Sequence, residues 1–170
     1  MAATEPLRLR ILKNLTAALK EITVANGYWI NAGDNVFRGR VVYGDNDPLP
    51  LLSILEVPIP LDQADVPADS EFSSGGWEIM IQGFVEDDEV HPTDPAHFFM
   101  ADVKKRLAKE KRKALEMESE DGILGLGQFI TNIRIGTGVV RPPDEISAKA
   151  YFWLTIMLDV VEDLTDPYEE

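Results

Sequence analysis

The first pattern in the chain is that of an amphipathic helix. Between residues 7 and 22, apolar side chains recur every three or four positions and polar or charged ones occupy the opposite side. This spacing predicts a helix of about four to five turns that packs on a sheet. We expect Thr4 to cap its start, Pro6 to lie in its first turn, and Asn26-Gly27 to end the segment in a left-handed conformation.

Strand patterns follow, separated by turn-rich stretches, at residues 28–30, 36–43, 51–57 and 77–85. The last is the clearest, because apolar residues alternate there with polar ones such as Glu78 and Gln82. One of its faces should pack, and the other should meet water or a partner. Residues 58–76 are rich in Pro, Asp, Ser and Gly, which predicts a flexible exposed loop that becomes ordered when something binds it.

A second helix is indicated by Asp94 as N-cap and Pro95 at the first helical position. Its apolar stripe consists of Phe99, Val103 and Leu107. It should end near Glu118, and the basic residues of its later half, 104–113, complement the helix dipole. We interpret this basic run as a solvated face; the alternative is contact with nucleic acid or an acidic partner.

The chain continues with a glycine-rich stretch at 122–127, a short predicted strand at 129–135, a Pro142-Pro143 turn, and a long strand at 149–161. Even positions of the long strand are apolar. Its odd positions are mixed, namely Tyr151, Trp153, Thr155, Met157 and Asp159. A strand with one apolar face and a half-apolar second face is typical of a sheet centre or an interface.

The order of these elements predicts an α+β fold. We expect a single domain over residues 1–170, with a mostly antiparallel β-sheet, two main helices packed on one face, and long connecting loops. Residues 58–76 would form the flexible loop and residues 162–170 an acidic tail.

Composition narrows the possible functions. The 170 residues include 30 acidic and 16 basic side chains, a net charge of -14, and no cysteine. These counts exclude a disulfide scaffold, a thiolate zinc site and a cysteine nucleophile, and argue against a protein that grips nucleic acid over most of its surface. The longest apolar run is about half of what a membrane span needs, and residues 1–10 lack the apolar stretch of a signal peptide.

Motifs that could carry chemistry are weak. The stretch 122–127 has the glycines of a phosphate loop, but it lies between a helix and a strand and no Lys-Ser/Thr follows it. Asp45-Asn46-Asp47 lacks the glycine and final glutamate of a calcium loop, so a turn is the better interpretation. Residues 86–89 with His91 resemble a solvated strand end more than a metal site.

Catalytic groups are equally sparse. Only His91 and His97 could serve as imidazole acids or bases, and no serine has the flanking glycines of a nucleophile elbow. With thirty acidic residues, a catalytic pair of carboxylates stays an open alternative, because a sequence does not give the distance between two side chains. We therefore predict no catalytic residue, no cofactor and no metal.

The order and length of the whole pattern resemble a known family. The segments that carry the resemblance are Ile11-Leu12-Lys13-Asn14-Leu15, Phe37-Arg38-Gly39-Arg40, Leu52-Ser53-Ile54-Leu55-Glu56, 77–87, Asp94-Pro95-Ala96 with 102–107, and 151–160. Together they resemble the tail terminator (tail completion) proteins of long-tailed, siphovirus-type bacteriophages, over nearly the whole chain. Residues 58–76 and 159–170 have no counterpart in the family pattern.

The resemblance implies a structural virion protein. Such a subunit forms a hexameric ring, caps the tail tube, ends its polymerisation and offers a surface to the head-side connector protein. Its expected partners are copies of itself, the major tail tube protein and the connector, with DNA passing through the lumen without specific binding and no membrane involved. It would assemble in the host cytoplasm and lie at the head-proximal end of the tail. A head-tail neck or stopper component, and a small acidic ligand-binding or enzymatic domain, are the alternatives.

The residues that we expect to touch partners lie in the first strands and their turns. Arg38 and Arg40, beside Phe37 on one strand face, suit an intersubunit contact or salt bridge. The turn from Asp45 through Asp47 to Pro48 is the second candidate, because exposed tips reach partners readily.

The net negative charge would have two effects in such a ring. Acidic residues in the lumen would repel DNA and keep it centred. Six copies of charge -14 would also repel one another, so salt should favour assembly.

Overall fold

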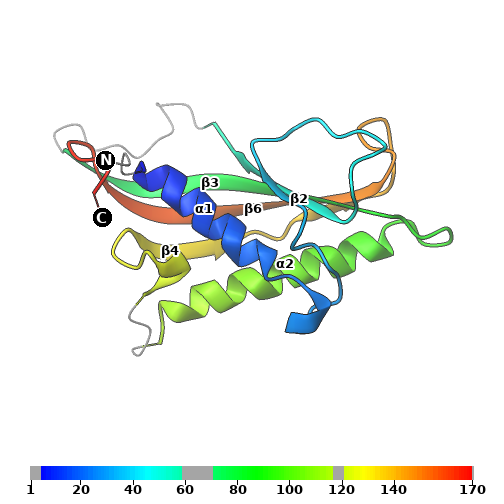
Figure 1. Ribbon diagram of the computed structural model, residues 1–170, viewed down its shortest axis with the longest axis horizontal. Helices are drawn as coiled ribbons and strands as arrows, with labels where there is room; N and C mark the ends of the chain where they lie inside the picture. Colours follow the sequence, from blue (N-terminus) through cyan, green and yellow to red (C-terminus); the bar gives the residue numbers. More distant parts are fainter. Residues whose placement is uncertain (1–4, 59–70, 117–120, 170) are drawn as a thin grey trace.

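A computed structural model describes residues 5–58, 71–116 and 121–169 of the protein. They form one α+β domain in which two main helices cover one face of a six-stranded mixed sheet, as predicted (Figure 1). The strand order is β1-β2-β3-β6-β4, with β5 also pairing with β6, and every pair is antiparallel except β1 with β2. The elements are α1 (Leu7–Lys20), η1 (Val24–Asn26), β1 (Val36–Arg38), β2 (Leu51–Glu56), β3 (Phe72–Val85), α2 (Asp94–Lys113), η3 (Ile123–Gly125), β4 (Ile130–Ile135), β5 (Val139–Arg141) and β6 (Ala150–Asp163).

The centre of the sheet is the pairing of β3 with β6, which runs without interruption from Phe72↔Asp163 to Val85↔Ala150. Alternate residues of both strands are buried against the helices, and Phe152 meets Phe99 of α2 edge-on, with ring centroids 5.3 Å apart. The residues between them point away from the helices. The long final strand therefore lies at the sheet centre, as its two unequal faces predicted.

The helices begin and end differently from the prediction in detail. α1 starts directly after Pro6, and its first amide, that of Leu7, donates to the carbonyl oxygen of Pro167 at 2.9 Å. The described part of the acidic tail is thus attached to the start of α1, and Figure 1 shows these two segments near each other. The N-cap of α2 is Thr93 rather than Asp94. Gly27 is left-handed as expected, but it closes η1 rather than α1. α2 ends at Lys113, before the end predicted near Glu118, so that prediction was wrong; Thr4 and Glu118 themselves lie outside the described residues.

One strand prediction was wrong, and two others had wrong bounds. Residues 28–30 form no strand, because the amides of Trp29 and Ile30 donate to the carboxylate of Asp102 instead of to a neighbouring strand. The strand predicted for 36–43 stops at Arg38, where Gly39 takes a φ of +67° and turns the chain. The predicted loop 58–76 falls largely at 59–70, outside the described residues, but 72–76 belong to β3. β5 was not predicted.

A buried ion cluster joins α2 to its surroundings. The Arg106 guanidinium contacts the Glu110 carboxylate at 2.7 Å and donates to the carbonyl oxygen of Ala18 in α1. Glu110 also accepts the amide of Leu124 at 2.8 Å and pairs with Lys113. Burial alone would raise the pKa of Glu110, but these hydrogen bonds and the Arg106 charge hold it below its ordinary value. The interpretation of the basic run 104–113 as a solvated face is therefore wrong for Arg106, which belongs to the core.

Candidate interaction site

A row of aromatic rings crosses the sheet face that the helices leave open. The consecutive ring pairs are Phe37–Tyr43, Tyr43–Phe84, Phe84–Tyr151 and Tyr151–Trp153, with centroids 5.2 to 6.3 Å apart. These separations are those of favourable tilted and offset aromatic contacts. The row connects β1, β3, β6 and the long loop 39–50, so it fixes the position of that loop on the sheet.

Arg40 holds the start of this loop in place. Its carbonyl oxygen accepts the hydroxyls of Ser53 at 2.6 Å and Tyr43 at 2.9 Å. Its guanidinium lies 4.8 Å from the ring centroids of both Phe37 and Tyr43 and pairs with Asp47. A guanidinium stacked on rings and paired with a carboxylate is strongly oriented.

The ionisable groups beside Arg40 have stable protonation states. The Gly44 amide and then the Arg40 side chain hold the pKa of Asp47 below its usual value, and burial raises the pKa of Tyr43. At neutral pH Asp47 is therefore ionised and Tyr43 is protonated. This favours a structural role, since an acid-base catalyst works best with a pKa near the ambient pH.

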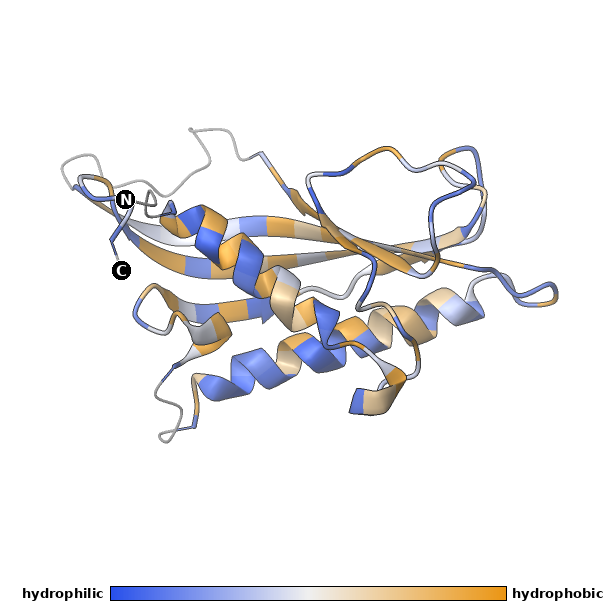
Figure 2. Cartoon of the chain, in the orientation of Figure 1, coloured by the Kyte–Doolittle hydropathy of each residue, from blue (hydrophilic) through white to orange (hydrophobic). Residues whose placement is uncertain are grey.

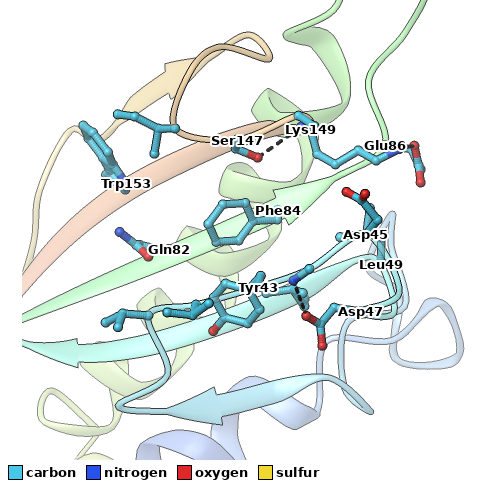
Figure 3. Close-up of a pocket in the computed structure, with 16 residues that line it drawn as sticks. Tyr43, Asp45, Asp47, Leu49, Gln82, Phe84, Glu86, Ser147, Lys149 and Trp153 are labelled. Carbon is cyan, nitrogen blue, oxygen red and sulfur yellow. Dashed lines mark hydrogen bonds and ion pairs between the residues drawn. The ribbon is translucent and has the colours of Figure 1, made fainter.

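A groove of about 500 Å³ lies between loop 39–50 and loop 142–149 (Figure 3). Gln82, Phe84 and Trp153 belong to the central strands that lie beneath it. Its apolar rim residues stand largely in solvent, with Val41 68%, Val42 77% and Ile146 68% exposed. Large apolar side chains that remain exposed together mark a surface for binding.

Charged residues line one end of the groove. Lys149 pairs with Glu86, and hydrogen bonding to Glu86 followed by the charges of Glu86, Asp87 and Asp45 raises the pKa of Lys149. The carboxylates outnumber the ammonium group, so this end of the groove is negative. Figure 3 shows Asp45, Glu86 and Lys149 close together beside the aromatic rings.

Loop 142–149 is held by Asp144. Its carboxylate accepts the Tyr151 hydroxyl and the amide of Ile146, both at 2.8 Å. Burial, together with this bond to Asp144, raises the pKa of Tyr151, so the phenol remains a hydrogen-bond donor. Both walls of the groove are therefore attached to the aromatic row.

The weak chemical motifs have structural explanations. Asp45-Asn46-Asp47 forms a turn closed by the Asp47 amide on the Gly44 carbonyl. In the glycine-rich stretch, Gly122 lies against Gly127, and the amide of Leu124 is already taken by Glu110. Within the described ranges no three His, Asp or Glu side chains gather as metal ligands. In the same part of the chain no helix combines the length and apolarity that crossing a membrane requires.

The structure separates the six predicted contact residues into two groups. Phe37, Arg40 and Asp47 form one cluster, and Asp45 lies with Asp47 along the groove. Arg38 does not share a face with Arg40: it donates to the Thr16 hydroxyl of α1 at 3.0 Å, because the chain turns at Gly39. Pro48 is exposed and does not line the groove.

Sequence reasoning missed most of the groove. Phe84, Trp153, Lys149 and Ile146 come from segments far from loop 39–50 in the chain, and only the strand register brings them together. The signal that was present is the half-apolar second face of the last strand, which indicated an interface without locating it.

Comparison with known proteins adds no identification: no protein-family model and no curated protein matches this chain.

Proposed function

We propose that this protein is a tail terminator: a structural subunit that closes into a ring, caps a bacteriophage tail tube and receives the head-side connector. The observation that carries the proposal is the open sheet face with its aromatic groove. Among the described residues the two main helices cover one face of the sheet and leave apolar and aromatic residues of the central strands accessible on the other. The order of helices and strands, which is the basis of the resemblance, agrees with this role.

Part of the open face has the composition of an interface core. Aromatic residues, methionine and arginine are enriched at such cores, and charged residues other than arginine are depleted. Phe84, Trp153, Met80 and Met157 are all half-buried residues of β3 and β6 that point away from the helices. A second protein surface would complete their burial.

The chemistry of the groove favours binding over catalysis. Asp47 is committed to Arg40, and Glu86 to Lys149, so these groups are held as ion pairs. A cavity lined by aromatic and charged groups could also take a small molecule, and this supports the ligand-binding alternative.

The acidic composition suits a ring through which DNA passes, because carboxylates do not bind phosphates.

The proposal is tested by capture on purified phage structures. The full chain is mixed separately with tail tubes and with head-side connectors, and bound particles are imaged by negative stain. A tail terminator caps one end of the tubes as a ring. Binding to connectors but not to tubes would favour a neck or stopper component, and binding to neither would contradict both.

A matched variant makes the capture specific. Val42→Glu changes a side chain that is 77% exposed on the groove rim and so should leave the fold intact. It should reduce capping if the open face carries the interactions. Val90→Glu makes the same change at a side chain that is 75% exposed and does not line the groove, and this variant should cap as the unaltered chain does.

A further inference from the structure

A second exposed aromatic feature lies on the helical side of the molecule. Trp29 and Phe98 stack with ring centroids 4.9 Å apart and an interplanar angle of 21°, although they are 51% and 53% exposed. Trp29 is fixed at its backbone, since its amide donates to the buried carboxylate of Asp102 at 2.7 Å. Rigid exposed aromatic pairs are typical of binding hot spots, because little entropy is lost when they are covered.

Positive charge continues from this pair along α2. Lys105, Lys109 and Arg112 lie seven, eleven and fourteen residues after Phe98, a spacing that places all four on one helix face. Lys105 and Lys109 are ordered over the Tyr28 ring, at 4.9 and 4.8 Å from its centroid. Figure 2 shows the hydrophilic character of this half of α2. We call Trp29, Phe98, Lys105, Lys109 and Arg112 the basic ridge.

The basic ridge and the groove are complementary. The ridge presents two stacked rings followed by cations, and the groove presents an apolar, aromatic cavity of about 500 Å³ with carboxylates at one end. Asp45 and Asp87 add negative charge beyond the Glu86–Lys149 pair. Apolar shape provides affinity in such contacts, while opposite charge selects the partner and its orientation.

One chain cannot bring these two surfaces together. Phe99 of α2 packs on the inner face of the sheet at Phe152, whereas Phe84 and Trp153 of the groove lie on the opposite face. The ridge therefore lies on the helical layer and the groove on the other side of the sheet. A contact between different surfaces of two identical subunits is heterologous, and its repetition closes a ring when the rotation allows.

We infer that the basic ridge of one subunit docks into the groove of the next, with Trp29 and Phe98 entering between loops 39–50 and 142–149. A second copy of this chain is the occupant that the opposed charges of the two surfaces select. The inference rests on the proposed function and identifies the contact that builds the ring.

Complementation between two variants tests this contact. Trp29→Ala/Phe98→Glu removes the ridge, and Val42→Glu/Ile146→Glu closes the groove; all four side chains are more than half exposed, so thermal unfolding should be unchanged. Each variant alone should associate about thirtyfold more weakly, the effect of losing one hot spot. An equal mixture should form dimers and nothing larger, because each pair retains one intact ridge and one intact groove.

Cross-linking tests the same contact on the tail tube. The chain has no cysteine, so two substitutions introduce the only thiols: Ala101→Cys, at an exposed position of α2 one turn after Phe98, and Ile146→Cys on the groove. A short bis-maleimide should link successive copies into a ladder that ends at the ring. Ala101→Cys with Thr131→Cys, a residue on the edge strand β4, is the matched control and should give no ladder.

Four outcomes would overturn the inference. Unaltered rings from either variant, or dimers from Ile146→Cys alone, would show that the ring uses another contact, and the proposed function would stand. A mixture that stays monomeric while the unaltered chain forms rings would also overturn the contact and leave the proposed function standing. An unaltered chain that never assembles, even on tubes, would remove the proposed function as well.

Discussion

Replacement of Glu110 by alanine should destabilise the fold strongly. Glu110 and Arg106 are 1% and 5% exposed, and the change leaves the Arg106 charge and the Leu124 amide without their buried acceptor. Breaking a buried pair from one side costs about 3–5 kcal/mol. Glu21 remains as a partner for Arg106 at 3.0 Å, so we expect the lower end of that range, about 3 kcal/mol.

The assay is urea unfolding followed by tryptophan fluorescence. With a denaturant slope of about 2 kcal/mol per molar, a loss of about 3 kcal/mol lowers the midpoint by about 1.5 M. Glu162→Gln is the control, because it removes a more exposed pair with Arg8 and should cost at most about 1 kcal/mol. A loss below about 1 kcal/mol for Glu110→Ala would refute the role given to the cluster.

The same cluster predicts a pH dependence. The pKa of Glu110 is lower in the folded than in the unfolded state, so the ionised group stabilises the fold above the unfolded pKa, about 4.3. That stability is lost as the pH falls through the folded pKa. Glu110→Gln should therefore show a weaker loss of stability on acidification between about pH 5 and 3. Equal loss in both proteins would contradict the assignment.

Three further changes test other parts of the structure. Gly83→Ala places a Cβ 2.1 Å from the buried Phe152 ring and should cost about 1–3 kcal/mol, a Tm decrease of several degrees, whereas Gly44→Ala should leave the Tm unchanged. Arg40→Met should raise the pKa of Asp47 measured by NMR without restoring its ordinary value, because the Gly44 amide remains; full restoration would contradict the geometry. Raising salt from 0.01 to 0.1 M should strengthen self-association measured by sedimentation. The screening length falls to about 10 Å, which weakens the repulsion between copies of charge -14 more than it weakens the attraction between ion pairs in contact. A steady weakening of self-association would contradict this prediction.

Periodicity predicted the elements that local sequence determines. The alternation in β3 and β6 and the helical spacing in α1 and α2 identified all four long elements, because each buries one continuous face. The predictions of the helix N-caps and of the short strands were less accurate. Residues 28–30 have strand-like side chains, but a carboxylate from α2, that of Asp102, takes two of their amides, and no local pattern signals such a distant acceptor.

The candidate site was only partly predictable for the same reason. One turn-rich segment of eleven consecutive residues contains Phe37, Arg40 and Asp47, so the local sequence was enough to predict them. Trp153 and Ile146 face that segment only through the β3–β6 pairing and the loop held by Asp144. The stacked pair of Trp29 and Phe98 likewise joins residues about seventy positions apart, which periodicity alone does not bring together.

The central claim is that this protein acts as a ring at the end of a tube, and particle mass tests it most directly. The full chain is measured alone and after release from purified tail tubes that it has capped. The account predicts a closed assembly of about six copies in at least one of these states. A single copy in both, at every concentration tested, would contradict it.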